Sequence, residues 1–199
     1  MTRKEILDAS AQIFSQKGYH GTSMQDIADA VNLQKASLYH HVSSKQEILF
    51  ELLNRGLHLL TEEVEQVIAE SSPPDERLRM AIQAYVTALT ENQDVTSVLL
   101  LEYRSLEPKY LKRHIIERDR FERIWRGLID MGIQERIFSC DDPSMAARAL
   151  LGAMNWTVTW FRYDGPLAAG DIANQITDLY LLGLTTRESV AEDYLDREI

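Results

Sequence analysis

Side chains suited to reading a DNA duplex lie close together near the N-terminus. Gln34 carries an amide that pairs with adenine, and Lys35 reaches guanine or a phosphate. Ala36 and Ser37 are small enough to let the backbone come close to the bases. Donors for phosphate oxygens follow at Tyr39, His40 and His41. This combination of residue types indicates contact with nucleic acid.

Three more side chains, Thr22, Ser23 and Lys45, lie where helices are expected to begin. The first N–H groups of a helix have no partner within the helix, and the helix dipole favours an anion there. We therefore expect phosphate contacts at these positions. Asp26 follows Ser23 at a spacing close to that of a capping box, which marks the start of a helix.

The elements that must position these side chains form a helix-turn-helix pattern. A first helix is expected to end at Lys17-Gly18, because glycine readily takes the left-handed conformation that ends helices. A helix over 24–30, a turn over 31–33 and a helix over 34–41 follow. In a DNA-binding helix-turn-helix, the second helix enters the major groove. The same pattern also arises as plain packing in all-helical proteins, so spacing alone leaves both interpretations open.

No group of residues in the sequence suits catalysis or metal binding. His40 and His41 are adjacent and point in different directions on a helix, and the other histidines lack a partner at metal-ligand spacing. Cys140 precedes the acidic Asp141 and Asp142, and neighbouring negative charge does not favour a reactive thiolate. We expect neither an enzyme nor a bound cofactor or metal.

The charge of the chain is unevenly distributed. The 199 residues carry a formal net charge of −10, yet residues 1–55 hold six basic and six acidic side chains. Attraction to DNA must therefore be local rather than a property of the whole surface. The single cysteine fits a reducing compartment, and the sequence shows neither a signal peptide nor an apolar run of roughly 18 residues. We expect a cytoplasmic protein with no membrane partner.

The rest of the sequence predicts long helices and no strands. Apolar residues recur at three- and four-residue steps, whereas strand alternation and hairpin turns are nearly absent. Helices are expected from residue 43 or 44 to the prolines at 73 and 74, and over 75–92, 95–106, 108–131, 143–163 and 170–184. The predicted fold is all-α, with a three-helix domain at 1–55, a larger helical domain at 56–185 and an acidic tail at 186–199.

Two of these helices are apolar over most of their circumference. In 143–163 the polar residues fall near one stripe, at Arg148, Asn155, Thr159 and Arg162. In 170–184 one side holds Asp171, Asn174, Gln175 and Asp178. Such helices must be buried on more than one side. They form either an interface with a second copy of the chain or the central core of a monomer.

The N-terminal residues resemble the DNA-binding domain of the TetR/AcrR family of bacterial regulators. The similarity covers about residues 3–55 and follows the strings Lys17-Gly18-Tyr19, Thr22-Ser23-Met24, Asp26-Ile27-Ala28, Ser37-Leu38-Tyr39-His40-His41-Val42 and Ser44-Lys45. The sequence departs from the family at Val42, where an aromatic residue is usual, and at Ala36, where glycine is common. Neither departure removes a DNA contact.

This resemblance implies a role for each matching position. Phosphates would be held by Thr22, Tyr39 and Lys45. The major groove would be faced by Gln34, Lys35, Ala36, Ser37 and His40. Leu38 and Val42 would pack in the small core, and Phe14 would anchor the first helix. The domain at 56–185 would bind a small-molecule effector and form a homodimer through the helices at 143–163 and 170–184.

Candidate effector contacts lie in this larger domain. Arg118 falls on the apolar stripe of helix 108–131 and suits an anionic ligand group; the alternative is an internal ion pair with Glu122. Aromatic residues suited to line an apolar cavity are Tyr85, Tyr103, Phe121, Trp125, Trp156 and Trp160. Aromatic residues at helical spacing also form ordinary cores, so both interpretations stay open.

A shorter resemblance concerns the C-terminal strings Asn155-Trp156, Trp160-Phe161, Asp164-Gly165-Pro166, Ile172-Ala173 and Leu179-Tyr180-Leu181-Leu182-Gly183-Leu184. They are similar to family members that sense acyl-CoA thioesters and regulate fatty-acid, phenylacetate or steroid degradation. The expected function is a repressor released from operator DNA by an effector such as an acyl-CoA. The alternatives are a repressor that senses a drug-like or aromatic compound, and a helical adaptor that has lost DNA binding.

Overall fold

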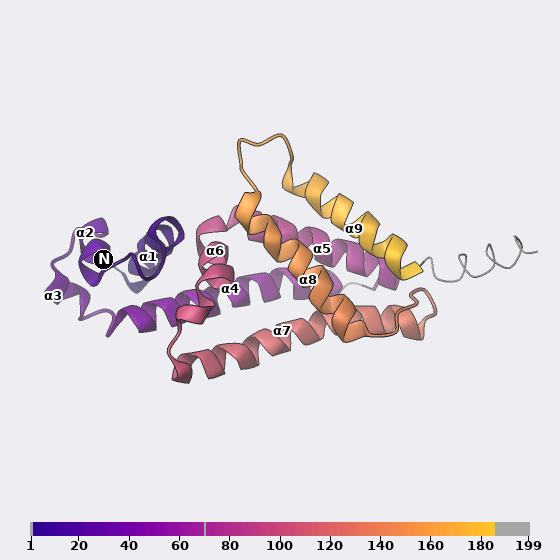
Figure 1. Cartoon of the computed structure of the whole chain (residues 1–199), viewed down its shortest axis with the longest axis horizontal. Coiled ribbons are helices and arrows are strands. Elements are labelled where there is room, and N and C mark those ends of the chain that lie inside the picture. Colours follow the sequence, from indigo (N-terminus) through magenta and orange to yellow (C-terminus); the bar gives the residue numbers. More distant parts are fainter. Residues whose placement is uncertain (1, 70, 186–199) are drawn as a thin grey trace, which may run out of the picture. The chain divides into compact units, whose positions relative to one another are not determined.

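The computed structural model describes residues 2–69 and 71–185, and within these ranges the protein is helical without strands (Figure 1). The helices are α1 (Arg3–Lys17), α2 (Met24–Ala30), α3 (Lys35–Leu38), α4 (Lys45–Ile68), α5 (Pro74–Glu91), α6 (Gln93–Leu101), α7 (Pro108–Gln134), α8 (Pro143–Trp160) and α9 (Ala169–Thr185). A 3₁₀ turn, η1 (Tyr103–Ser105), follows α6. The prediction of an all-α fold is confirmed.

The described chain divides into two compact units. The N-terminal unit holds the residues up to Leu60 together with Glu91–Asp119, and the C-terminal unit holds Thr61–Thr90 together with the residues from Arg120 onward. Helices α4 and α7 each continue from one unit into the other. The functional domains expected at 1–55 and 56–185 stay a prediction, and the tail expected at 186–199 lies outside the described residues.

Local signals set the first helices where the sequence predicts them. Thr2 caps α1 in a capping box with Glu5, and Ser23 caps α2 in the same way with Asp26. Gly18 ends α1 with φ of 75°, a conformation that costs glycine little because it has no Cβ. Asn32 also has a positive φ, 52°, in the turn that follows α2.

Five helix ends differ from the predicted ones by three residues or more. Helix α4 ends at Ile68, before the prolines, and α7 continues to Gln134. Helix α3 ends at Leu38, because the N–H groups of His40 and His41 bond to carbonyls three residues earlier and close a turn. Helix α6 ends at Leu101 and gives way to η1. Helix α8 ends at Trp160, because Phe161 takes an extended conformation with ψ of 138°.

The core of the N-terminal unit holds α1 to α4 together. Phe14, Leu38 and Val42 are all buried there, as predicted. Tyr19 packs its ring edge-on against Phe14, with the centroids 5.4 Å apart. The other fully buried apolar side chains of these helices include Ile6, Ile27, Ile48, Leu49, Leu52 and Leu53. This core fixes the short helices whose outer sides carry the candidate DNA contacts.

A glycine allows one close approach in the C-terminal unit. A Cβ placed on Gly132 of α7 would lie 2.0 Å from a ring carbon of Phe138. The ring of Phe138 is buried, and the N–H of its own residue donates to the Gly132 carbonyl at 3.0 Å. Gly132 therefore lets the chain after α7 turn back tightly onto the helix.

Candidate nucleic-acid interface and effector contacts

The predicted recognition helix presents its polar side chains to solvent. Gln34, Lys35, Ala36 and His40 are exposed, and 47% of the Tyr39 surface is accessible. Ser37 and His41 are half-buried. Leu38 has no exposed surface, so it fastens α3 to the core from the opposite side. The sequence predicted that these residues contact DNA, and the structure leaves most of their side chains exposed.

The side chain of Thr22 is less accessible than the prediction of a phosphate contact suggests. The residue is 2% exposed, and its hydroxyl donates to the carbonyl of Gly18 at 2.9 Å. Ser23 is exposed but its hydroxyl is engaged in the capping box with Asp26. The Nζ of Lys17 lies 3.1 Å from a carboxylate oxygen of Asp26. The two hydrogen bonds from Ser23 and, after them, this contact with Lys17 hold the pKa of the Asp26 carboxyl well below its usual value.

Lys45 is tied to the loop that precedes α2. Its ammonium group donates to the carbonyl oxygens of Thr22 at 2.6 Å and of Tyr19 at 2.8 Å. The same group lies 4.2 Å from the centroid of the Tyr19 ring. Burial lowers the pKa of Lys45 from its usual value. Sequence reasoning missed this tie, because Tyr19 and Lys45 lie on different elements and carbonyl acceptors leave no trace in residue types.

Arg3 makes a second tie that sequence reasoning missed. Its guanidinium donates to the backbone carbonyl of His41 and to the carboxylates of Glu47 and Glu51. Glu47 also accepts from the N–H of Ser43 at 2.6 Å. These bonds lower the pKa of Glu47 to about 2, with the Ser43 bonds the largest cause. Arg3 thereby joins the start of α1 to the turn that follows the recognition helix.

Gln46 links the first turn of α4 to the segment around η1 within the same unit. Its amide nitrogen donates to the carbonyl of Ser105 at 2.8 Å, and its amide oxygen accepts from the N–H of Glu107 at 2.9 Å. The carboxylate of Glu102 accepts from the N–H of Tyr19 at 3.1 Å. The segments on either side of the helix-turn-helix are therefore hydrogen-bonded to residues 102–107, far along the chain.

Two of the predicted effector contacts, Tyr103 and Arg118, belong to the N-terminal unit. Tyr103 is half-buried, and its ring centroid lies 6.4 Å from that of His114. His114 is 2% exposed and its Nδ1 has no hydrogen-bond partner. Burial lowers the pKa of His114, and the charge of Arg118 lowers it further. Arg118 itself is exposed, and its guanidinium lies 3.6 Å from the carboxylate of Asp119.

The C-terminal unit brings three predicted contacts together. The ring centroid of Tyr85 lies 5.7 Å from that of Phe121 and 5.5 Å from that of Trp125. The hydroxyl of Tyr85 donates to the amide oxygen of Asn155, and burial raises the pKa of Tyr85. The Nε1 of Trp125 is buried without a partner. The aromatic cluster therefore contains one satisfied and one unsatisfied polar group.

Glu122 is paired differently from the alternative weighed for Arg118. It accepts from Nε of Arg148, on α8, at 2.9 Å. The interpretation of an ion pair between Arg118 and Glu122 is wrong, because Arg118 has Asp119 as its neighbour and Glu122 has Arg148. Glu122 therefore pairs with Arg148 of α8 instead of Arg118, which lies one turn away on α7.

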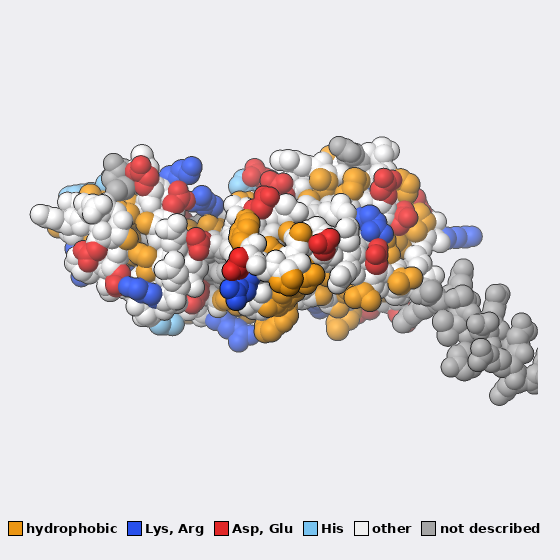
Figure 2. All heavy atoms as spheres, turned by 90° about the horizontal axis from the view of Figure 1, so that it is seen from above, with side chains coloured by type: hydrophobic (Ala, Val, Ile, Leu, Met, Phe, Trp, Pro, Cys, Tyr) orange, Lys and Arg blue, Asp and Glu red, His pale blue; other side chains and the backbone are white. Residues whose placement is uncertain are grey.

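Trp156 and Trp160 lie on the outer side of α8, although they were expected to line an apolar cavity. They are 67% and 45% exposed. Leu179 and Leu182 of α9 are 73% and 59% exposed. The space-filling view shows hydrophobic side chains gathered on the surface of this part of the chain (Figure 2). We call these four side chains the apolar face of α8 and α9.

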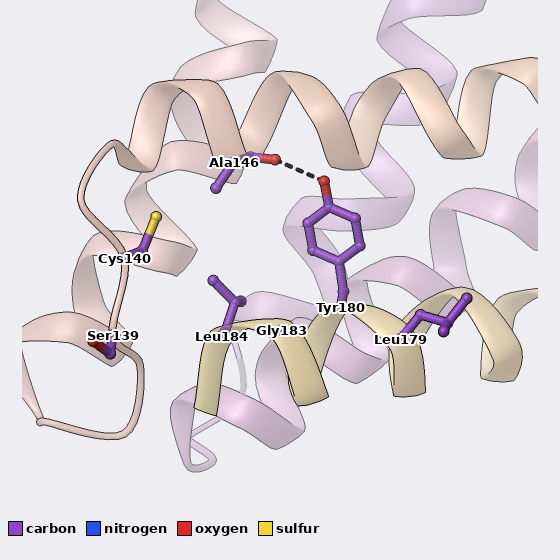
Figure 3. Close-up of a pocket in the computed structure, with 7 residues that line it drawn as sticks. All are labelled: Ser139, Cys140, Ala146, Leu179, Tyr180, Gly183 and Leu184. Atoms are coloured by element: carbon purple, nitrogen blue, oxygen red, sulfur yellow. Dashed lines mark hydrogen bonds between the residues drawn. The ribbon is translucent and has the colours of Figure 1, made fainter. Parts of the chain in front are cut away.

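A pocket of about 250 Å³ lies between the start of α8, the segment before it and the end of α9 (Figure 3). Its walls are Ser139, Cys140, Ala146, Leu179, Tyr180, Gly183 and Leu184. The Tyr180 hydroxyl donates to the Ala146 carbonyl at 3.1 Å, and burial raises the pKa of Tyr180 to about 12. The pocket is smaller than the roughly 300 Å³ at which ligand sites usually begin. It contains none of the predicted effector contacts.

Neither metal binding nor membrane insertion finds support in residues 2–69 and 71–185. No group of three or more His, Cys, Asp or Glu side chains in these ranges is arranged to hold a metal ion. No helix there has the length and apolar character needed to cross a membrane.

Comparison with known proteins identifies the family. The model of the bacterial regulatory proteins of the tetR family matches residues 6–52, and that of the tetracyclin repressor-like C-terminal domain matches residues 71–184. The HTH-type transcriptional repressor KstR2 of Mycobacterium tuberculosis is 29% identical over 185 residues, which make up 92% of this chain and 92% of KstR2.

Two solved structures are similar along nearly the whole chain. The TetR family regulator PfmR from Thermus thermophilus is 38% identical with a TM-score of 0.83, covering 88% of this chain and 96% of PfmR. AibR in complex with isovaleryl coenzyme A and operator DNA is 28% identical with a TM-score of 0.81, covering 92% of this chain and 97% of AibR. The family and these relatives are transcriptional regulators and not enzymes, as the sequence predicted. The chain belongs to the tetR family of bacterial regulatory proteins.

Proposed function

We propose that this regulator is a homodimeric repressor that leaves its operator when it binds an acyl-CoA thioester. The observation that carries the DNA-binding part is the exposed polar side of α3, with Gln34, Lys35 and His40 accessible over a fully buried Leu38. A short helix fixed from behind and polar in front suits entry into a major groove. The other proposed operator contacts are Thr22, Ser23, Ala36, Ser37, Tyr39, His41 and Lys45.

The structure modifies how three of these residues would act. Thr22 and Ser23 use both their hydroxyls and their backbone N–H groups in internal hydrogen bonds, so each would contact a phosphate only in exchange for one of these bonds. Lys45 holds two carbonyls and would reach a phosphate only in exchange for one of them. We assign Lys45 chiefly to holding the loop and assign base reading to Gln34 and Lys35.

The apolar face of α8 and α9 supports the homodimer. Trp156, Trp160, Leu179 and Leu182 are exposed on neighbouring helices, and a monomer gains nothing from placing such side chains in water. In a two-fold dimer the two recognition helices would enter major grooves about 34–36 Å apart on a roughly palindromic operator. The net charge of −10 makes non-specific DNA affinity modest, so both half-sites would be needed.

One relative supports the effector class, and a second supports repression. AibR has been solved with isovaleryl coenzyme A and operator DNA, and KstR2 carries the name of a transcriptional repressor. The proposed contacts for the acyl part are the buried aromatic cluster of Tyr85, Phe121 and Trp125. The unpartnered Nε1 of Trp125 offers a donor for a carbonyl oxygen. An effector shifts DNA affinity only by its difference in affinity for the two conformations.

The DNA-binding part is tested by selecting an operator from a random duplex library and measuring its affinity across salt concentrations. Gln34→Ala is expected to cost about 1–3 kcal/mol and to relax specificity at one base position. Gln16→Ala, an exposed amide on α1, is the matched control. Equal binding of selected and random DNA would show an adaptor that has lost DNA recognition.

The effector is tested by a thermal-shift screen over acyl-CoAs of different chain length, the corresponding free acids and aromatic drugs. An acyl-CoA effector raises the unfolding midpoint and releases the operator at the same concentration. Stabilisation and release by an aromatic drug alone would replace the acyl-CoA with that class of effector.

A further inference from the structure

The pocket between α8 and α9 is built entirely from residues of the C-terminal unit (Figure 3). Leu184, which is 5% exposed, forms its floor, and the half-buried Cys140, Ala146 and Tyr180 form its sides. Figure 3 shows the side chains of Cys140, Ala146 and Leu184 pointing toward one another across the pocket. Gly183 is exposed and lies at the mouth, so the pocket can be reached from solvent.

Two hydrogen bonds hold the walls of this pocket in place. The N–H of Ser139 donates to the carbonyl of Leu184 at 2.8 Å and joins the segment before α8 to α9. The hydroxyl of Tyr180 donates to the carbonyl of Ala146 at 3.1 Å and joins α9 to α8. Walls that are already fixed in the free protein lose little freedom when a ligand binds. The pocket is therefore preformed.

A glycine keeps one wall of the pocket open. Gly183 lies in the last turns of α9, and a Cβ there would meet no atom of the described residues within 4 Å. Packing inside the unit therefore does not require a glycine, and alanine would suit the helix better. The missing side chain leaves room that a molecule other than this chain can fill.

The lining suits an uncharged ligand that carries a hydrogen-bond donor. Among the described residues, no charged side chain lines the pocket, and the acidic Asp141 and Asp142 directly follow Cys140. An anionic ligand would find no cation here and would meet like charges nearby. The Tyr180 hydroxyl uses its hydrogen on Ala146, so its lone pairs remain to accept a bond from a ligand. Burial raises the pKa of Tyr180 to about 12, which keeps this hydroxyl neutral at physiological pH.

The volume of the pocket limits the ligand to a small molecule. An apolar cavity of about 150 Å³ is enough to hold benzene. A pocket of about 250 Å³ therefore accommodates a six-membered ring with a short substituent. The pocket shares no residue with the aromatic cluster of Tyr85, Phe121 and Trp125 that we assign to the effector. It is a separate place on the molecule.

We propose that this pocket binds a small, uncharged ring compound with one hydroxyl group, such as a simple aromatic alcohol. The ring lies against Leu184 and the open wall at Gly183, and its hydroxyl donates to the oxygen of Tyr180. This second ligand site goes beyond the proposed function, because it requires neither operator DNA nor an acyl-CoA.

A second copy of the chain is the other candidate occupant. Leu179, which lines the pocket, also belongs to the apolar face of α8 and α9. An apolar side chain from a second copy would leave the acceptor of Tyr180 unused, whereas a hydroxyl compound engages it. The lining therefore favours the small molecule.

Cys140 provides the measurement, because it is the only cysteine of the sequence and its thiol lines the pocket. The rate at which iodoacetamide alkylates the full-length protein is measured at rising concentrations of benzyl alcohol or benzoate. Benzyl alcohol is expected to slow alkylation about threefold or more, because a bound ring covers the thiol. We expect a dissociation constant of about 1 mM or lower, which suits a ligand of this size. Benzoate, which is anionic and lacks a donor, is expected to give no protection.

Gly183→Leu fills the pocket from its open wall and is expected to abolish the protection by benzyl alcohol. Gly127→Leu is the matched control, because a Cβ on Gly127 of α7 also meets no atom of the described residues within 4 Å. This control is expected to keep the protection. Thermal unfolding of both variants verifies that they are folded.

Tyr180→Phe serves as a second variant, since it removes the proposed acceptor and keeps the ring. It is expected to weaken benzyl alcohol binding about threefold to tenfold. Binding of toluene, which has no donor, is expected to change less than about twofold. Equal losses for both compounds would overturn the role of the Tyr180 oxygen.

Three results would overturn the site itself. The first is a wild type whose alkylation benzyl alcohol does not slow, and the second is protection that persists in Gly183→Leu. The third is alkylation that slows as the protein dimerises but does not respond to benzyl alcohol, which would give the pocket to the second copy. None of these measurements involves operator release by an acyl-CoA, so the proposed function is tested separately.

Discussion

The ammonium group of Lys45 donates a hydrogen bond to the carbonyl oxygen of Thr22, with a distance of 2.6 Å. The bond joins the first residue of α4 to the loop immediately before α2. A side chain expected from sequence to hold a DNA phosphate therefore also sets the position of a neighbouring candidate DNA contact. Loss of Lys45 would therefore change the conformation of the loop before α2 as well as the charge of the candidate DNA-binding surface.

Replacing Lys45 by methionine is expected to reduce the free energy of unfolding by about 1–3 kcal/mol. The variant loses two hydrogen bonds from a charged donor and leaves the carbonyls of Tyr19 and Thr22 without it. Urea denaturation measures the change, and Lys4→Met at an exposed position of α1 is the control. Unchanged stability with lost operator affinity would show that Lys45 acts on DNA directly.

Glu47→Gln is expected to weaken the stability of the protein at neutral pH by about 1–2 kcal/mol and to have little effect near pH 2. The folded-state pKa of Glu47 is about 2, below that of an unfolded glutamate. Its carboxylate therefore contributes stability that is present above pH about 4.3 and is lost as pH falls toward 2. Urea denaturation of wild type and variant across this range measures the difference.

The matched control for this prediction is Glu63→Gln, an exposed position of α4. Its stability difference from wild type should stay small at every pH. A Glu47→Gln difference that does not shrink on acidification would mean that the bonds from Arg3 and Ser43 do not depend on the charge of the carboxylate.

Local sequence signals accounted for most of the fold. Capping residues, glycines and apolar spacing act within one or two turns of a helix, so they predicted the bounds of α2 and the capping role of Ser23. The family resemblance likewise pointed to Leu38 and Val42 as core residues, and both are buried.

Contacts between distant residues accounted for what the sequence did not predict. Arg3 pairs with Glu47 and Glu51, which lie more than forty residues later in the sequence. The type of a charged residue alone does not reveal such a distant partner. The same holds for Glu122, which pairs with Arg148 on another helix. The exposure of Trp156 and Trp160 depends on which side of α8 faces the core, and a helix that is apolar over most of its circumference does not disclose that side.

Gly132→Ala is expected to destabilise the protein by about 1–3 kcal/mol, because the new methyl group would meet the ring of Phe138. Gly127→Ala is the control on the same helix, since a Cβ there meets no atom within 4 Å. That control should instead gain up to about 1 kcal/mol from improved helix propensity. Thermal and urea unfolding compare the two. Equal effects would mean that the segment around Phe138 moves freely enough to make room.

Trp156→Glu is expected to weaken self-association by about tenfold or more, because it places a charge within the apolar face of α8 and α9. Sedimentation velocity over a range of concentrations measures the dimer dissociation constant. Leu101→Glu is the matched control, because Leu101 is also an exposed apolar side chain, at 57%, and belongs to α6 in the N-terminal unit. Operator binding should fall in parallel with dimerisation in the first variant and stay unchanged in the second. A dimer that survives Trp156→Glu would move the interface away from α8, and a monomeric wild type would remove the paired half-site model altogether.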